Sequence, residues 1–284
     1  MEKKKLDQYK GFEQGPIRPP SEASSLLIRL TRNCPWNRCS FCSVYKRGKF
    51  SLRSVENIIK DIDTLCGYIK GVKQLVKPGG YADSKVFNTL YNSFEEKDRG
   101  AFNAAMNFYA SGMKSIFLQD ANSLIMKPDD LVFVLEHIKK CFPHVDRVTS
   151  YARSHTIVRI KQDDLKRMAD AGLNRIHVGM ESGSDTVLKK INKGATKADH
   201  IKAGLKIKKA GMELSEYVMP GLGGIEYSIE HALETASALN AINPDFIRIR
   251  TLALTNGTTL AKEAEQGEFE KPSDAMMAKE LRLF

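Results

Sequence analysis

The chain has 284 residues, of which 42% are hydrophobic and 27% are charged, and its formal net charge is +10. No apolar run approaches the roughly 20 residues that a membrane-spanning helix needs, so we expect no membrane partner. The length and composition favour one large α/β domain or two smaller domains with a sizeable core. The positive charge favours an anionic partner, although lysine-rich helix faces give the same sum.

Cysteine usage indicates a reducing compartment. The chain has five cysteines, and the charged start at residues 1–20 is followed by no apolar segment of the kind found in a signal peptide. An odd number of cysteines without an export signal argues against a disulfide framework. We therefore expect a cytoplasmic protein.

The first third of the chain reads as one βα unit with additions on both sides. Residues 1–24 form a polar, proline-bearing leader, and residues 25–33 predict a strand that ends at Cys34. Apolar residues at helical spacing then predict a helix from Val55, with Ser54 as its N-cap. Residues 72–112 break this rhythm with glycines and a run of charges, and we interpret them as an insertion.

From Lys114 onward, predicted strands alternate with predicted helices. The predicted strands are 114–120, 146–153, 174–181, 213–221 and 245–254, and the helices between them are 128–142, 163–172, 197–211 and 228–242. This alternation implies parallel strands with right-handed crossovers. It predicts a partial (β/α)6 TIM-like barrel over residues 25–255, in preference to an open doubly wound sheet. Residues 256–284 look like the start of a C-terminal helical extension that the chain truncates.

Polar residues recur at every second position of the predicted strands. Examples are Arg29 and Thr31, His177 and Glu181, Ser215 and Tyr217, and Arg248 and Arg250. Buried parallel strands are normally apolar on both faces. The pattern therefore predicts a barrel with a polar cavity, and exposed edge strands or internal ion pairs are the alternative interpretation.

Three of the five cysteines lie within nine positions, in the spacing Cys34-x4-Cys39-x2-Cys42. Thiolates this close bind a metal or a cluster, or react with one another. A structural zinc site needs four ligands, and we interpret the remaining Cys66 and Cys141 as core or surface thiols. Three cysteines leave one iron of a [4Fe-4S] cluster without a protein ligand, where a small molecule can bind. The loop also follows the first strand, at the end where parallel α/β proteins place their active sites.

This cysteine loop resembles that of the radical S-adenosylmethionine (SAM) superfamily. The usual loop of that family is C-x3-C-x2-C after the first strand of a partial (β/α)6 barrel, with an aromatic residue near the adenine before the last cysteine. Phe41 matches that aromatic position. The present loop departs from the family pattern by one extra residue between the first two cysteines.

The resemblance extends over residues 25–255 and implies further site residues at strand ends. Segments "QDANS", "HVGMESGSD" and "VMPGLGG" fall where the family contacts the methionine amine, the ribose and carboxylate, and the adenine. The SAM contacts implied in this way are Phe41, Asp120, Asn122, Arg153, Glu181, Ser182 and Gly221, and the implied cluster ligands are Cys34, Cys39 and Cys42. Within the superfamily the segments look most like the branch of oxygen-independent coproporphyrinogen oxidase, the methylthiotransferases and the Elongator catalytic subunit.

The resemblance also implies a reaction and its cofactors. A [4Fe-4S] cluster and SAM would be the cofactors, and an electron donor such as flavodoxin or ferredoxin would reduce the cluster. Reductive cleavage of SAM would give methionine and a 5'-deoxyadenosyl radical that acts on the substrate, as in an oxidoreductase or transferase. Arg29, Arg248 and Arg250 favour an anionic substrate if they point inward, and Tyr151 and Tyr217 are candidate radical relays.

Two alternatives stay open. The three cysteines are structural if the protein is a binding protein stabilised by zinc or an iron-sulfur cluster. The positive charge is functional if the chain is an RNA-modifying member of the same superfamily. We do not favour nucleic acid as a partner, because the sequence has no long basic block and no aromatic-interleaved RNA-binding motif.

Overall fold

The computed structural model describes residues 7–46, 48–75 and 84–284. Its main feature is a sheet of six parallel strands whose order in space, β1-β4-β5-β6-β7-β8, follows their order along the chain. The strands of this sheet are β1 (Leu26–Arg29), β4 (Ser115–Gln119), β5 (Arg147–Ala152), β6 (Leu173–Glu181), β7 (Glu213–Val218) and β8 (Phe246–Ile249). A small hairpin pairs β2 (Thr31–Arg32) with β3 (Ser51–Leu52).

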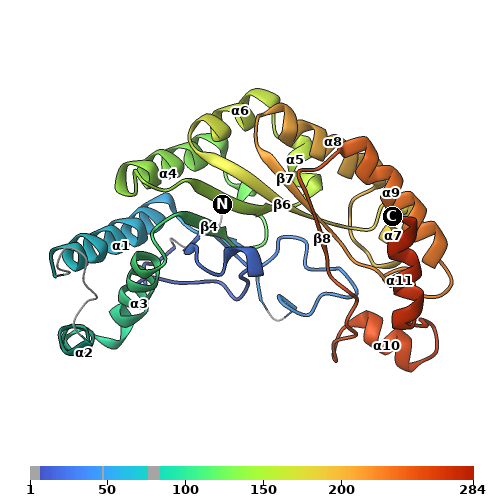
Figure 1. The fold of residues 1–284 in the computed structure, drawn as a ribbon, viewed down its shortest axis with the longest axis horizontal. Coiled ribbons are helices and arrows are strands. Elements are labelled where there is room, and N and C mark those ends of the chain that lie inside the picture. Colours follow the sequence, from blue (N-terminus) through green and yellow to red (C-terminus); the bar gives the residue numbers. More distant parts are fainter. Residues whose placement is uncertain (1–6, 47, 76–83) are drawn as a thin grey trace, which may run out of the picture.

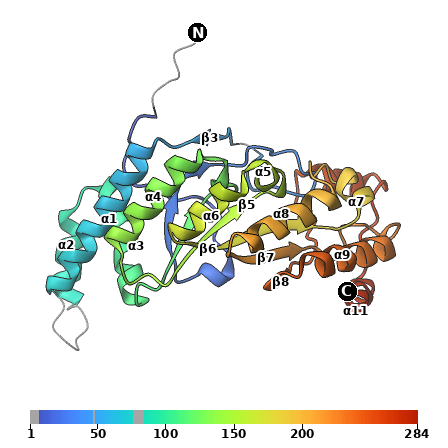
Figure 2. The same ribbon diagram turned by 90° about the horizontal axis from the view of Figure 1, so that it is seen from above.

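Helices cover the outer face of this curved sheet, as an arc around the strands in Figure 1. Figure 2 shows the same helices lying side by side along one face. The helices of this layer are α1 (Val55–Leu75), α4 (Pro128–Cys141), α6 (Gln162–Asp170), α8 (Lys197–Lys209) and α9 (Ser228–Ile242), with the short α5 (Ser154–Arg159) and α7 (Asp185–Lys190) at strand ends. The arrangement confirms the predicted partial TIM-like barrel.

The strands from β1 to β7 in the sheet bury outward-facing side chains against these helices, whereas the apolar side chains of the last strand, β8, are exposed. Ile28, Leu118, Ile176 and Leu214 are fully buried in one continuous core. Helix α1 contributes residues at helical spacing to the same core, and Ser54 accepts a hydrogen bond from the backbone N–H of Asn57, which confirms it as the N-cap. Apolar burial on the outer face thus leaves the alternate, inward-facing positions free for polar side chains.

The inward-facing positions carry aromatic and polar side chains, as the period-two pattern predicts. The rings of Tyr151, His177 and Tyr217 have centroids 5.5 to 6.1 Å apart, and Phe117 meets Tyr151 edge to face at 5.3 Å. On the last two strands the inward-facing contact is a hydrogen bond, because the Arg248 guanidinium donates to the hydroxyl of Ser215 on the neighbouring strand.

Within the segment expected to be a leader, residues 7–13 contact α1 and the hairpin, whereas residues 15–22 pack against inward-facing side chains of the barrel. The Gln119 amide exchanges hydrogen bonds with the backbone of Gly15 and also donates to the Ile17 carbonyl. A 3-10 turn, η1 (Pro20–Glu22), places Glu22 in the interior, where its carboxylate lies 3.3 Å from the His177 ring nitrogen. This part of the chain is therefore built into the interior of the barrel, and residues 1–6 lie outside the described residues.

The segment expected to be an insertion, 72–112, begins inside α1 and contains α2 (Ser84–Ser93) and α3 (Glu96–Ala110). Helix α3 buries Phe102, Ala105 and Phe108, and it packs against α1 and the edge strand β1. Residues 76–83 lie outside the described residues. The described part of the segment therefore covers the open edge of the sheet at β1.

Two helices follow the last strand, α10 (Thr259–Glu265) and α11 (Asp274–Leu283). Helix α11 packs on α9 at the β8 side of the barrel (Figure 1). Its Glu280 is buried, and the carboxylate accepts hydrogen bonds from the Gly221 N–H and the Ser228 hydroxyl. Among the described helices, none combines the length and apolarity required to cross a bilayer.

Candidate active site

The cysteine loop runs between β2 and β3 and lies over the C-terminal ends of the parallel strands. The small hairpin brings its two ends together, and Asn33 begins it with a left-handed φ of 64°. The Asn33 N–H donates to the Asp120 carboxylate after β4, and the Trp36 indole donates to the Asn192 carbonyl after α7. Backbone hydrogen bonds also join Ser40 to Ile191. Contacts with several βα units therefore fix the loop above the strand ends.

Cys34, Cys39 and Cys42 line a cavity of about 390 Å³ at this end of the barrel. Its walls come from the cysteine loop, the ends of β5, β6 and β7, and the segment after β8. All three cysteines are free and partly buried. Burial raises the pKa of the Cys39 thiol, although the cations of Lys193 and Arg153 act against this shift. A thiol in such a place needs a metal or cluster to hold it as a thiolate.

The positions of the three sulfurs discriminate between kinds of metal site. Tetrahedral zinc with Zn–S bonds of about 2.3 Å requires sulfurs about 3.8 Å apart. The three sulfurs do not form a group in which every pair lies within 4.8 Å, and no histidine or carboxylate of the described chain completes such a group with them. The three sulfurs are therefore not gathered around one point as a single zinc ion would require. Three cysteine ligands without a fourth would leave one iron of a [4Fe-4S] cluster open.

Arg153 and Arg250 bring positive charge to this cavity. The Arg153 guanidinium lies 5.1 Å from the Trp36 ring centroid and donates to the Lys193 carbonyl at 2.8 Å. Burial lowers its pKa, against the effect of Cys34 and Cys39. Within the described part of the chain, no carboxylate forms an ion pair with Arg153 or Arg250. Two arginines without acidic partners make the cavity a suitable site for an anion.

Glu181 ends β6 in a left-handed conformation with φ of 66°, which is uncommon for a residue with a side chain. Its carboxylate forms an ion pair with Lys193 at 3.1 Å and lines the cavity. Gly179 makes room for it, because a Cβ there would lie 2.3 Å from a Glu181 carboxylate oxygen. The backbone strain at Glu181 thus directs a carboxylate into the cavity.

Phe41 lies on the cavity wall between two of the cysteines, with the Lys193 ammonium 6.0 Å from its ring centroid. Its other contacts are apolar, because it packs against the small core cluster that includes Leu222 and Leu260. The ring therefore offers an apolar surface next to the sulfurs. Of the seven SAM contacts expected from the sequence, Phe41, Arg153 and Glu181 are those that the structure brings together in the cavity lining.

The side chains of Asp120 and Asn122 lie beside the cavity but are engaged elsewhere. Asp120 is buried and paired with Arg29 at 2.6 Å, and it accepts from the Asn33 N–H. Asn122 donates to the Thr156 hydroxyl and accepts from the Arg153 N–H. Neither residue is part of the cavity lining, so their positions indicate that they fix the cysteine loop and Arg153.

Ser182 and Gly221 also lie outside the lining. The Ser182 hydroxyl is buried and paired with His231 of α9 at 2.8 Å. Gly221 has φ of 85°, and its N–H donates to Glu280 of α11. The structure thus gives Ser182 a partner on α9 and Gly221 a partner on α11, and neither residue lines the cavity.

Lys193 and Trp36 are site residues that sequence reasoning missed. Lys193 follows α7 in "INKG", a pattern that ordinarily marks a helix end, and Gly194 has the left-handed φ of 68° typical of that position. A Cβ at Gly194 would lie 2.5 Å from the Trp36 ring. The glycine thus permits the contact between the cysteine loop and this turn. A lysine in a helix-ending turn carries no signal of this role in the sequence, because its ion pair with Glu181 appears only in the structure.

The model of the Radical SAM superfamily matches residues 28–236 of the chain. The tRNA-2-methylthio-N(6)-dimethylallyladenosine synthase of Christiangramia forsetii is 24% identical over 257 residues, covering 88% of this chain and 47% of that protein. The tRNA uridine(34) acetyltransferase of Methanocaldococcus infernus is 26% identical over 110 residues, 38% of this chain and 21% of that protein. The chain thus spans about half the length of the first of these relatives.

Among solved structures, coproporphyrinogen III oxidase from Escherichia coli, described as a radical SAM enzyme, superposes with a TM-score of 0.55 at 13% identity. The match covers 91% of this chain and 50% of that chain. At this identity the likeness concerns the fold alone. It agrees with the six parallel strands and their outer helices.

Proposed function

The chain belongs to the radical SAM superfamily, and we propose that Cys34, Cys39 and Cys42 hold its [4Fe-4S] cluster in the cavity above the strand ends. Members of this family are enzymes that use that cluster and SAM as cofactors. When bound and reduced, the cluster supplies the electron that cleaves SAM to methionine and a 5'-deoxyadenosyl radical. The observation that carries the assignment is the set of three free cysteines of one loop that line one cavity above the strand ends.

We further propose roles for the three predicted contacts that line the cavity. Arg153 binds the SAM carboxylate, because its buried guanidinium has no carboxylate partner in the described chain. Glu181 accepts from the SAM amine or ribose, and its ion pair with Lys193 holds the carboxylate in position before the ligand enters. Phe41 packs against the adenine. Each role requires only a side chain that already faces the cavity.

The inward-facing tyrosines shape the substrate end of the same space. Tyr151 lies on β5, two residues before Arg153, and Tyr217 lies on β7 opposite Gly179 of β6; both line the cavity. Burial raises the pKa of Tyr151, and the neighbouring Tyr217 raises it further, so the phenol keeps its proton at neutral pH. We propose that the substrate contacts these phenols and that Arg250 attracts it by charge. The substrate is therefore an anion.

RNA is a more specific candidate for that anionic substrate. It is supported by the two relatives whose printed names describe tRNA modification and by the net charge of +10. A phosphate backbone would meet Arg250, which has no carboxylate partner among the described residues and lines the cavity.

The cluster assignment predicts a clear difference between two cysteine variants. Anaerobically reconstituted protein, reduced with dithionite in the presence of SAM, should release 5'-deoxyadenosine, and Cys39→Ala should abolish the release. Cys66→Ala is the matched control, because Cys66 belongs to the core beneath the outer helices. It should retain the cluster absorbance and the release. Equal release by Cys39→Ala, or loss in both variants with intact folding, would contradict the assignment.

The substrate proposal predicts that Arg250→Ala weakens RNA binding. A tRNA pool should bind the loaded enzyme at low salt, and the variant should lose affinity and show a shallower salt dependence. Arg167→Ala is the matched control, because Arg167 lies exposed on α6, far from the cavity lining. Equal binding by the wild type and both variants would reject the role of Arg250. Absent RNA binding with intact SAM cleavage would reject RNA and leave the cluster assignment standing.

A further inference from the structure

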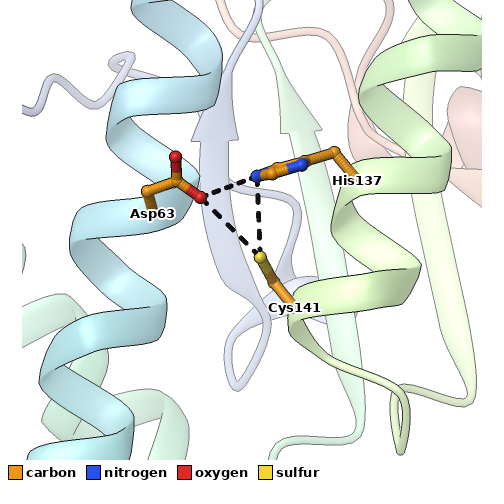
Figure 3. A group of neighbouring side chains, drawn as sticks. All are labelled: Asp63, His137 and Cys141. Carbon is orange, nitrogen blue, oxygen red and sulfur yellow. Dashed lines mark hydrogen bonds and ion pairs between the residues drawn. The ribbon is translucent and has the colours of Figure 1, made fainter.

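A second group of metal-binding side chains lies on the outer surface, between α1 and α4. Asp63 comes from α1, and His137 and Cys141 come from α4 (Figure 3). None of the three lines the active-site cavity. The His137 ring nitrogen Nε2 lies 2.7 Å from Asp63 Oδ1 and 3.6 Å from Cys141 Sγ, and that sulfur lies 3.9 Å from the same carboxylate oxygen.

The helices explain why these three atoms converge. His137 and Cys141 are four residues apart on α4, so their side chains lie on one face of the helix, one turn apart. Helix α1 packs directly against α4, and this contact brings Asp63 to that face of α4. Asp63 is 58% exposed, whereas His137 is 21% exposed. Two ligands are therefore held by one helix, and the third is free to adjust.

The distances are close to those of a tetrahedral site. Zinc bonds of about 2.3 Å to sulfur and about 2.05 Å to nitrogen or oxygen place N and S about 3.6 Å apart and N and O about 3.3 Å apart. The observed N to S distance is 3.6 Å, and the S to O distance of 3.9 Å is a few tenths longer than required. Only the hydrogen-bonded pair of His137 and Asp63, at 2.7 Å, has to open, and the exposed carboxylate can rotate to do so.

The donor types and the surroundings select the kind of metal. Imidazole and thiolate together suit zinc and exclude a good site for calcium or magnesium, which prefer oxygen ligands. Lys70, Lys73 and Lys140 line an adjoining cavity together with Cys141 and make the surroundings cationic. A cation bound through weak charge attraction would be disfavoured there, so the affinity must come from bonds to sulfur and nitrogen.

We propose that Asp63, His137 and Cys141 bind one zinc ion, with water as the fourth ligand. The ion joins α1 to α4 on the outer surface and is separate from the cysteine loop. Cys66 is not one of the ligands, because its sulfur does not complete the group of ligand atoms that all lie within 4.8 Å of one another. The site stabilises the packing of α1 against α4.

The test uses the cluster-loaded enzyme, so that the three cysteines of the active-site loop are already occupied. After exposure to zinc and removal of the excess, the wild type should retain one zinc per chain besides the iron of its cluster. X-ray absorption at the zinc edge should show one sulfur and several nitrogen or oxygen neighbours. His137→Gln and Cys141→Ser should lose this zinc. His144→Gln, a change of an exposed histidine just beyond α4, should retain it.

A further variant guards against loss of zinc through misfolding. His137→Cys replaces one zinc ligand by another, so this variant should keep the zinc and show a second sulfur neighbour. Wild-type enzyme without zinc at this step would overturn the proposal, as would zinc retained by Cys141→Ser. Zinc surrounded mainly by sulfur in the wild type would also overturn it, because that signature belongs to the active-site loop.

Discussion

Glu181 adopts a backbone conformation that costs about 1 to 3 kcal/mol for a residue with a side chain. The structure compensates by the ion pair with Lys193 and by the absence of a side chain at Gly179. The strained backbone thus motivates the proposed role of the Glu181 carboxylate in the cavity. At the same cavity wall, the Arg153 guanidinium lies over the Trp36 ring.

Glu181→Gln should weaken SAM binding more than folding. The amide keeps the size of the side chain but removes the charge, and a hydrogen bond to a charged group contributes about 1.5 to 3 kcal/mol. We therefore expect the KM for SAM to rise about tenfold or more while the melting temperature changes by only a few degrees. Glu263→Gln, on the C-terminal helix α10, provides the matched control. An unchanged KM would remove Glu181 from the SAM site.

At the scale of elements, short turns after the strands and helices assemble the cavity. The turn after α7 holds the cysteine loop through Trp36, and it supplies Lys193 to Glu181. The turn after β4 holds the same loop through Asp120. Helix α11 anchors the turn after β7 through Glu280. The site therefore depends on contacts between turns that are distant in sequence.

Gly194→Ala tests the turn after α7. Its φ of 68° is strained for alanine, and the new Cβ would lie 2.5 Å from the Trp36 ring, so the loop must shift. We expect a loss of about 2 to 4 kcal/mol in the free energy of unfolding, together with weaker cluster loading. Gly211→Ala is matched in φ, at 84°, but its Cβ would meet open space. It should cost about 1 kcal/mol and leave cluster loading intact, and equal effects would contradict the proposed contact.

Much of the architecture could be predicted from the sequence, because local patterns encode it. Helical and strand periodicity gave the six βα units, and the cysteine spacing gave the centre of the site. Side-chain direction at the strand ends could not be predicted, since a shift of one residue turns a side chain to the other face. This is why Ser182 was expected in the cavity but contacts His231 instead. The pair of Glu22 and His177 joins residues 155 positions apart, and no local pattern records such a contact.

At the scale of the whole molecule, buried histidines couple stability to pH. His231 and His200 are fully buried, and burial lowers their pKa to about 4 and to about 3, respectively. Burial also lowers the pKa of His177, although Glu22 opposes the shift. All three are therefore neutral in the folded protein at neutral pH, while the unfolded chain binds protons near pH 6.5.

This difference predicts a loss of stability on acidification. Because the folded pKa values lie below the unfolded value, the stabilisation is complete above about pH 6.5 and is lost as the pH falls toward the folded values. At pH 5 each of His200 and His231 should cost about 2 kcal/mol. Anaerobic thermal unfolding between pH 7.5 and pH 5 should show a steady fall in melting temperature. A melting temperature that rises toward pH 5 would contradict the account, because the buried Glu216, whose pKa burial raises, would then outweigh the neutral imidazoles.

The most direct test of the central claim is electron paramagnetic resonance of the reduced, reconstituted protein with and without SAM. Three cysteine ligands leave one iron open to SAM, so we expect the signal of a reduced [4Fe-4S] cluster whose shape changes when SAM is added. The Cys34→Ala, Cys39→Ala and Cys42→Ala variants should each lose that signal, and Cys66→Ala should keep it. A cluster signal that SAM leaves unchanged, or protein that takes up zinc at these cysteines and no cluster, would contradict the claim.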